Sequence, residues 1–205
     1  MKILSAAKDS ANNLQVLMLS EKFGHALDKP LEKMARKIPV SPNSLSITGF
    51  IITVFACYIL SFDLLSGGVL ILVGALFDVL DGIVARTQNK MTRFGAFLDS
   101  VLDRYSDAFI LLAIAYNMGN VSNATGVMLS MGSLLGSFLI SYSRARAEGI
   151  GEECKYGIME RPERLILLSI GAISGFIIPA LWALVVLTNF TVMQRIYYVW
   201  NATNK

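Results

Sequence analysis

The stretch DVLDGIVARTQNKMTRFGAFLDSVLD, residues 78–103, places four aspartates between segments that are apolar enough to enter a lipid bilayer. Asp78 and Asp81 are three residues apart, and Asp99 and Asp103 are four apart, so on a helix each pair shares one face. With a turn between the pairs and a rise of about 1.5 Å per residue, two antiparallel helices would bring all four carboxylates to a similar depth. We therefore expect a carboxylate cluster near one end of a helical bundle.

Composition indicates a membrane protein built from helices. Hydrophobic residues make up 54% of the 205-residue chain, charged residues make up 16%, and the mean hydropathy is +0.56. Soluble domains carry about 25% charged residues, and a spanning helix needs roughly 20 apolar residues. We expect an all-α membrane protein with residues 41–205 as its membrane domain. The six predicted transmembrane helices are residues 43–62, 67–87, 95–117, 124–146, 161–178 and 179–200.

The boundary between the last two predicted helices depends on one short segment. SGFIIPA, residues 174–180, contains a glycine and a proline. A single long helix is the alternative, but these two residues favour a break between Gly175 and Pro179.

Residues 1–40 are expected to form one or two basic amphipathic helices beside the membrane. Apolar residues recur there at helical spacing among several Lys and Arg residues, a pattern typical of helices on an anionic membrane surface. A solvated helix that caps the bundle is the alternative. A signal peptide is not expected, because no compact apolar core precedes a small-residue cleavage site.

The distribution of Lys and Arg predicts the orientation. These residues gather before the first predicted span, after the second and after the fourth, whereas the turns SFDLLSGG, NMGNVSNAT and SGFIIPA contain none. Cytoplasmic loops carry the excess of positive charge. We expect a multi-pass protein of the cell membrane with both termini and the aspartates on the cytoplasmic side.

Four neighbouring carboxylates need a counter-charge. They repel one another, and each costs about 2.5–3.5 kcal/mol at the centre of a membrane helix. His25 is the single histidine, and Cys57 and Cys154 show no ligand spacing, so neither a histidine-based metal site nor a disulfide is expected. Oxygen ligands favour Mg²⁺, Mn²⁺ or Ca²⁺ over zinc. Two such ions, completed by substrate phosphate oxygens, suit in-line phosphoryl transfer.

Two other interpretations of the aspartates stay open. They could form salt bridges with Arg86, Arg93 and Arg104 inside the membrane. They could also line a proton or cation pathway, since intramembrane acids mark transport as well as catalysis.

The full motif is more specific than its aspartates. The spacing D-x2-D-G-x2-A-R-x8-G-x3-D-x3-D is kept at every position from Asp78 to Asp103. This resembles the signature of the CDP-alcohol phosphotransferases. The resemblance implies six transmembrane helices, a homodimer, a site for two Mg²⁺ ions that could also take Mn²⁺, and no nucleic-acid partner. It also implies transfer of a phosphatidyl-type group from a CDP-lipid to an alcohol, with release of CMP.

The same resemblance assigns roles to individual residues. The implied metal ligands are Asp78, Asp81, Asp99 and Asp103. Asp103 would also be the base that deprotonates the acceptor hydroxyl. The implied contacts with the CDP-lipid are Asn43, Ser44, Leu45, Ser46, Gly82, Arg86 and Thr92. Taken alone, the residues SPN at 41–43 indicate only a helix start with Ser41 or Asn43 as its cap. Direct in-line attack is preferred, and an aspartyl intermediate stays open.

The acceptor is predicted from the second half of the chain. SYSRARAEG, MERPERLI and TVMQRIYYVW resemble segments of the phosphatidylinositol phosphate and archaetidylinositol phosphate synthases, which implies inositol 1-phosphate as acceptor. The matching cations for its phosphate are Arg144, Arg161 and Arg195. Independently, Arg195 is a lone charge in the last span and thus a functional candidate. Glycerol 3-phosphate is the alternative acceptor, and the donor could be CDP-diacylglycerol or CDP-archaeol.

Each of the three arginines also has a plainer interpretation. Arg195 could extend along its helix to the membrane surface. Arg144 could be a positive-inside anchor. Arg161 could be paired locally with Glu160 and Glu163, which flank it.

Overall fold

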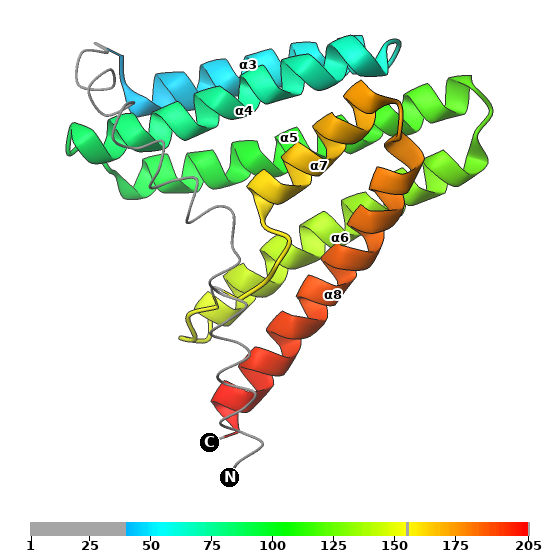
Figure 1. Cartoon of the computed structure of the whole chain (residues 1–205). Coiled ribbons are helices and arrows are strands. Elements are labelled where there is room, and N and C mark those ends of the chain that lie inside the picture. Colours follow the sequence, from blue (N-terminus) through cyan, green and yellow to red (C-terminus); the bar gives the residue numbers. More distant parts are fainter. Residues whose placement is uncertain (1–39, 155, 205) are drawn as a thin grey trace.

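The computed structural model describes residues 40–154 and 156–204, and within these residues all regular structure is helical (Figure 1). The helices are α3 (Pro42–Leu60), α4 (Leu64–Thr87), α5 (Arg93–Asn120), α6 (Ala124–Glu148), α7 (Arg161–Ser174) and α8 (Ile177–Thr203). Every predicted segment from residue 43 onward corresponds to one of these helices, so the all-α prediction is confirmed. The predicted amphipathic helix and His25 lie outside the described residues.

The break between the last two helices is confirmed. Helix α7 ends at Ser174, and Gly175 follows with a φ of +78°. Glycine adopts this left-handed conformation without a steric penalty, and it commonly ends helices in this way. Pro179 lies in the first turn of α8, where a missing backbone N–H does no harm.

Polar side chains cap the starts of several helices. Ser41 accepts a hydrogen bond from the backbone N–H of Ser44 and begins α3, which settles the choice between Ser41 and Asn43. Asp63 caps α4 through the N–H groups of Leu65 and Ser66. Such caps satisfy donors that the helix itself leaves unpaired.

Helix α3 packs closely against α4 and also contacts α5. Glycines allow the α3–α4 approach: a Cβ on Gly67 would lie 2.4 Å from the Cα of Leu60, and one on Gly74 would lie 2.5 Å from Thr53 Oγ1. Helices α6 and α8 form a second pair, and α7 crosses between the two groups and contacts α4 and α8 (Figure 1). Helices α4 and α5 run antiparallel, but the extensive contacts of α4 are with α3 and α7 and not with α5.

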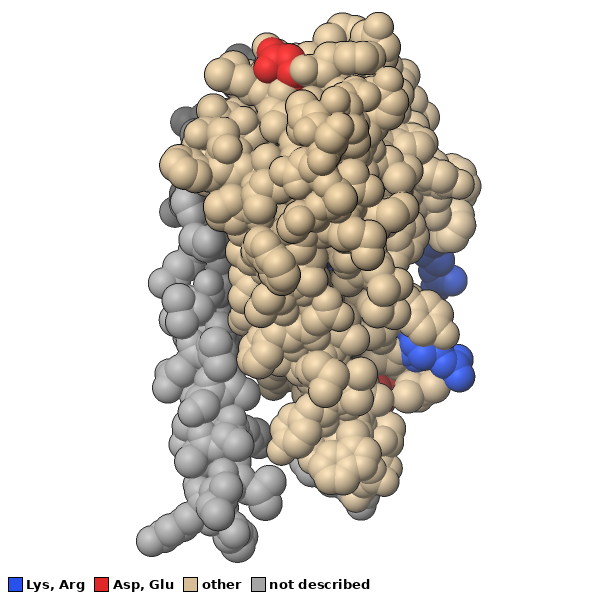
Figure 2. Space-filling model, turned by 90° about the vertical axis from the view of Figure 1, so that its right-hand side faces the viewer, with Lys and Arg blue, Asp and Glu red and all other residues tan. Residues whose placement is uncertain are grey.

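Four of the described helices are long and apolar enough to cross a membrane, namely α3, α4, α6 and α8. Helix α7 has 14 residues, about 21 Å at the usual rise, which is shorter than the roughly 30 Å hydrocarbon core. Helix α5 has 28 residues but carries several charged ones. Figure 2 shows one face of the molecule, on which uncharged residues cover nearly all of the surface drawn in colour.

The three turns without Lys or Arg lie together. The α3–α4, α5–α6 and α7–α8 connections are all on the right of Figure 1, and the α4–α5 and α6–α7 connections lie toward the other side. Cys57 and Cys154 are both buried and free.

Candidate active site

Arg161 joins the aspartates of α4 to those of α5. It is the first residue of α7, and its Nη1 lies 2.7 Å from Asp78 Oδ2 and 2.8 Å from Asp103 Oδ1. Arg161 thus pairs with aspartates of α4 and α5 and not with the neighbouring Glu160 and Glu163. Helix α7 packs against α4. From there Arg161 reaches the carboxylates of both Asp78 on α4 and Asp103 on α5.

Asp81 is held by a residue near the start of α3. Ser46 donates a hydrogen bond from its hydroxyl to Asp81 Oδ2, and both side chains are buried. Farther along α3, a Cβ on Gly49 would lie 3.1 Å from Asp78 Oδ1. Glycine at this position therefore lets α3 pass close to the aspartate face of α4.

Asn43 and Thr92 meet at the starts of α3 and α5. A Cβ on Gly95 would lie 2.9 Å from Asn43 Oδ1 and 2.9 Å from Thr92 Oγ1. The Gly95 backbone N–H donates to Thr92 Oγ1 at 2.9 Å, so Thr92 is the N-cap of α5. The motif glycine thus makes room for two of the residues implied to bind the CDP-lipid.

The remaining donor-side residues differ in exposure. Leu45 is buried against Ile83 and Val84, so its side chain belongs to the core. Ser44 is exposed and shares a hydrogen bond of 2.8 Å with the Ser41 hydroxyl.

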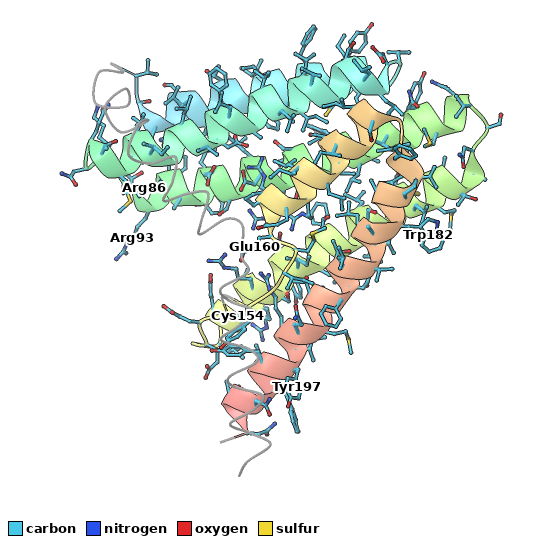
Figure 3. The ribbon with its side chains drawn as sticks, viewed as in Figure 1. Arg86, Arg93, Cys154, Glu160, Trp182 and Tyr197 are labelled. Carbon is cyan, nitrogen blue, oxygen red and sulfur yellow. The ribbon has the colours of Figure 1, made fainter. Side chains whose placement is uncertain are left out.

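Arg86 folds back along its own helix toward Gly82. A Cβ on Gly82 would lie 3.4 Å from Arg86 Nη1, so this glycine leaves space beside the guanidinium. Figure 3 shows Arg86 and Arg93 near the turn that joins α4 to α5. Another cation, Arg104 on α5, lies 3.6 Å from Asp103 Oδ2.

Arg195 is buried and points into the protein. Its side chain is 2% exposed, its Nε donates to the carbonyl of Tyr156 at 2.7 Å, and its Nη1 donates to the carbonyl of Ile140. Its Nη2 lies 3.9 Å from Glu160 Oε1. These contacts disfavour extension to the membrane surface and tie α8 to α6 and to the α6–α7 loop. Gly157 has a φ of +143° and lies against this arginine.

Glu160 connects Arg195 with the surroundings of Arg144. Burial raises the pKa of the Glu160 carboxyl above its ordinary value, while the charges of Arg144 and Arg195 act in the opposite direction. Arg144 itself is half-exposed and pairs with Glu148 at 3.0 Å. Figure 3 places Glu160 at the start of α7, close to α6. The three candidate acceptor arginines thus come from three helices, and Glu160 is adjacent in sequence to one of them.

Two site residues were not predicted from the sequence. Asp107 follows Asp103 by one helical turn, and its Oδ2 lies 2.6 Å from Nη2 of Arg164. The four-residue spacing of Asp99, Asp103 and Asp107 was the available signal. Nothing in the sequence distinguishes Arg164 from the other basic residues around the α6–α7 loop.

The carboxylates suit a hard divalent cation by their chemistry. Asp78 Oδ2 is buried and lies 2.7 Å from Arg161 Nη1, and carboxylate oxygens are the ligands that Mg²⁺ and Mn²⁺ prefer. Across residues 40–154 and 156–204, however, no group of three or more His, Cys, Asp or Glu side chains is arranged so that it could hold a metal ion. Arg161 is the cation that lies between Asp78 and Asp103 in this structure.

The chain is similar to proteins of one family. A family model described as CDP-alcohol phosphatidyltransferase matches residues 39–197. Archaetidylinositol phosphate synthase of Methanothermobacter thermautotrophicus is 36% identical over 185 residues, which cover 87% of this chain and 92% of that protein. Phosphatidylinositol phosphate synthase of Mycobacteroides abscessus is 34% identical over 195 residues, with 89% and 87% covered.

Solved structures show the same fold. The crystal structure of Mycobacterium tuberculosis phosphatidylinositol phosphate synthase with CDP-DAG bound has a TM-score of 0.76 and 31% identity, and the match covers 85% of this chain and 94% of that one. The same enzyme in complex with manganese and citrate has a TM-score of 0.75 and 30% identity, with 85% and 89% covered.

Proposed function

The chain belongs to the CDP-alcohol phosphatidyltransferase family, and on this premise we propose that it transfers a phosphatidyl-type group from a CDP-lipid to inositol 1-phosphate and releases CMP. Relatives named archaetidylinositol phosphate synthase and phosphatidylinositol phosphate synthase support the acceptor. Their names cover both ether and ester lipids, so the donor class is CDP-archaeol or CDP-diacylglycerol.

One observation carries the proposal. Arg161 Nη1 lies 2.8 Å from Asp103 Oδ1 and 2.7 Å from Asp78 Oδ2. A cation suited to a phosphate is therefore next to the carboxylate suited to act as base. An acceptor that carries both a phosphate and a hydroxyl can engage the two groups together, which a simple alcohol cannot.

The proposed metal ligands are Asp78, Asp81, Asp99 and Asp103. A bound pair of Mg²⁺ or Mn²⁺ ions would supply Lewis-acid stabilisation of the diphosphate. The manganese complex of the Mycobacterium tuberculosis enzyme supports a divalent metal. Ser46 would orient Asp81 through its hydrogen bond, so the start of α3 would contribute to the geometry of this ligand.

The proposed donor site lies where α3, α4 and α5 come together. Asn43 and Ser44 from α3, with Thr92 at the start of α5, would contact the CDP moiety. Leu45 would contribute only its backbone, because its side chain is buried. Gly82 leaves room for the donor beside Arg86, whose guanidinium would bind the diphosphate by paired hydrogen bonds.

In the proposed reaction Asp103 accepts the proton of an acceptor hydroxyl. The resulting alkoxide forms a bond to the lipid-side phosphorus, the bond from that phosphorus to the CMP oxygen breaks, and CMP leaves with the electron pair. Arg86 would offset the charge that develops on the leaving group. Arg161, Arg195 and Arg144 would hold the acceptor phosphate, with Arg161 closest to Asp103.

We further propose that six helices cross the membrane, that both termini and the site face the cytoplasm, and that two copies form a homodimer. The grouping of the turns without Lys or Arg on one side supports the orientation. Helix α5 would be admitted to the membrane because its charged residues face the site and neighbouring helices.

A CMP-release assay tests the function. Purified protein in detergent with CDP-lipid and Mg²⁺ is given inositol 1-phosphate or glycerol 3-phosphate in parallel. We expect metal-dependent CMP release with inositol 1-phosphate, at a kcat/KM at least about tenfold above that with glycerol 3-phosphate. Preference for glycerol 3-phosphate would replace the proposed acceptor. Metal-dependent CMP release without any ion gradient would exclude cation transport as the sole activity.

A further inference from the structure

Asp107 follows the four motif aspartates of α4 and α5 and differs from them in its contacts. It lies one turn beyond Asp103 on the same helix face, and it is buried, with 7% of its surface exposed. Its carboxylate points to α7: Oδ2 lies 2.6 Å from Arg164 Nη2, and Oδ1 lies 3.8 Å from Arg161 Nε. Asp107 thus contacts both arginines of the first turn of α7.

Arg164 completes the connection. It is 4% exposed, and its Nη1 donates to the carbonyl of Met159 at 3.2 Å. One guanidinium therefore joins α5 to the buried residue that lies two positions before α7. A buried ion pair is weak evidence for stability, because the loss of hydration offsets most of the attraction. Its effect on geometry is more direct, since it fixes where α7 begins.

The position of Arg161 depends on that first turn. Arg161 and Arg164 are three residues apart and share one side of the helix. From this anchored turn the Arg161 side chain reaches Asp78 and Asp103 with Nη1, while Asp107 faces its Nε. The acidic groups that face Arg161 are therefore Asp78 on α4 and Asp103 and Asp107 on α5.

We propose that Asp107 and Arg164 are positioning residues that hold the Arg161 guanidinium between Asp78 and Asp103. The inference rests on the proposed function, because it makes Arg161 the cation that receives the acceptor phosphate next to the base. Asp107 touches neither substrate and acts through Arg161.

Kinetics of Asp107→Asn test the proposal, because asparagine keeps the shape and removes the charge. We expect KM for inositol 1-phosphate to rise about ten- to a hundredfold, the range that a small misplacement of a site residue produces. KM for the CDP-lipid should change less than about twofold, and Arg164→Gln should give the same separation.

Asn117→Ala is the matched control. Asn117 is a buried polar residue of the same helix, and its side-chain amide donates to the carbonyls of Leu60 and Ser61 at 3.4 and 3.3 Å, at the opposite end of α5. Its loss should lower the thermal unfolding temperature in detergent and leave both KM values within about twofold. An equal rise in acceptor KM for Asn117→Ala and Asp107→Asn would show that a general loss of stability causes the change, and it would overturn the proposal.

A double-mutant cycle separates positioning from a direct role. If Asp107 acts through Arg161, Asp107→Asn should add nothing to the acceptor KM of Arg161→Gln. Additive effects of the two substitutions would overturn the inference. Should the unmodified enzyme prefer glycerol 3-phosphate, the proposed acceptor fails, whereas the same cycle with that acceptor still decides the role of Asp107.

Discussion

The proposed donor side and the proposed acceptor side of the site are built in different ways. The donor side comes from residues near the starts of α3 and α5 and the end of α4, and most of them lie within the 26 residues from Asp78 to Asp103. The acceptor side draws one arginine from each of α6, α7 and α8, spread from Arg144 to Arg195. A compact motif can encode the reaction and the donor, whereas the acceptor depends on how three distant helices pack.

The two sides also differ in what neutralises their charges. The aspartates of α4 and α5 meet a guanidinium from α7, and Asp81 meets a serine hydroxyl. On the acceptor side Arg195 is surrounded by backbone carbonyls and lies near Glu160. Arg161 is a proposed acceptor residue that contacts two proposed metal ligands, Asp78 and Asp103, so it links the two proposed sides.

The largest effect is expected on the donor side, from Asp103→Asn. Loss of the proposed base should lower CMP release by about 10²–10⁴-fold, the usual contribution of general base catalysis. Binding of the CDP-lipid, measured by its protection against thermal unfolding, should persist.

Asp63→Asn is the control for that substitution. Asp63 is exposed and caps α4 at the end far from the motif, and asparagine caps helices equally well. Its activity should stay unchanged. Near-normal turnover of Asp103→Asn would remove Asp103 from the role of base.

Arg161→Gln should affect both sides in opposite directions. KM for inositol 1-phosphate should rise by about ten- to a hundredfold because a cation that binds the acceptor phosphate is lost. Mn²⁺ should bind the substrate-free protein more tightly, because the competing guanidinium no longer lies between Asp78 and Asp103. Titration followed by electron paramagnetic resonance measures the second effect.

Arg161→Lys sharpens the result, since lysine keeps the charge but cannot form paired hydrogen bonds. We expect Mn²⁺ affinity near that of the unmodified protein and an intermediate acceptor KM. Weaker Mn²⁺ binding in Arg161→Gln would show that Arg161 supports the metal ligands instead of competing with the metal.

Arg195→Gln tests whether the deepest acceptor arginine binds phosphate or only ties helices together. We expect acceptor KM to rise by about three- to tenfold while KM for the CDP-lipid stays constant. A lower unfolding temperature is also expected, since the hydrogen bonds to Tyr156 and Ile140 are changed. If both KM values rose together in proportion to the loss of stability, Arg195 would only hold α8 against α6 and the α6–α7 loop and would not bind the acceptor phosphate.

Ser46→Ala should have the smallest effect. It removes the hydrogen bond to Asp81, and a single hydrogen bond contributes about 1 kcal/mol, or roughly fivefold in a binding constant. The change should appear in the apparent constants for metal and CDP-lipid, with acceptor KM unaffected. A shift confined to acceptor KM would mean that the two sides are not separate.

Much of the fold could be predicted because it follows from local patterns. Apolar runs of sufficient length located the six described helices, and Gly175 located the break between α7 and α8. The motif spacing identified the family. Packing, in contrast, requires knowing which helices touch: no local pattern says that α3 packs on both α4 and α5, or that α7 is only 14 residues long.

The sequence by itself determined the helices, the four aspartates and the chemistry that their spacing implies, because each depends on residues within a few turns of one another. Only the tertiary structure decided that Arg161 would lie between Asp78 and Asp103, and that Asp107 and Arg164 would form an ion pair beside it. These contacts join residues more than 55 positions apart, and their geometry is set by helix packing. Residues 78–103 therefore indicate a class of reaction, while the first turn of α7, far along the chain, supplies the arginine that contacts two of their aspartates.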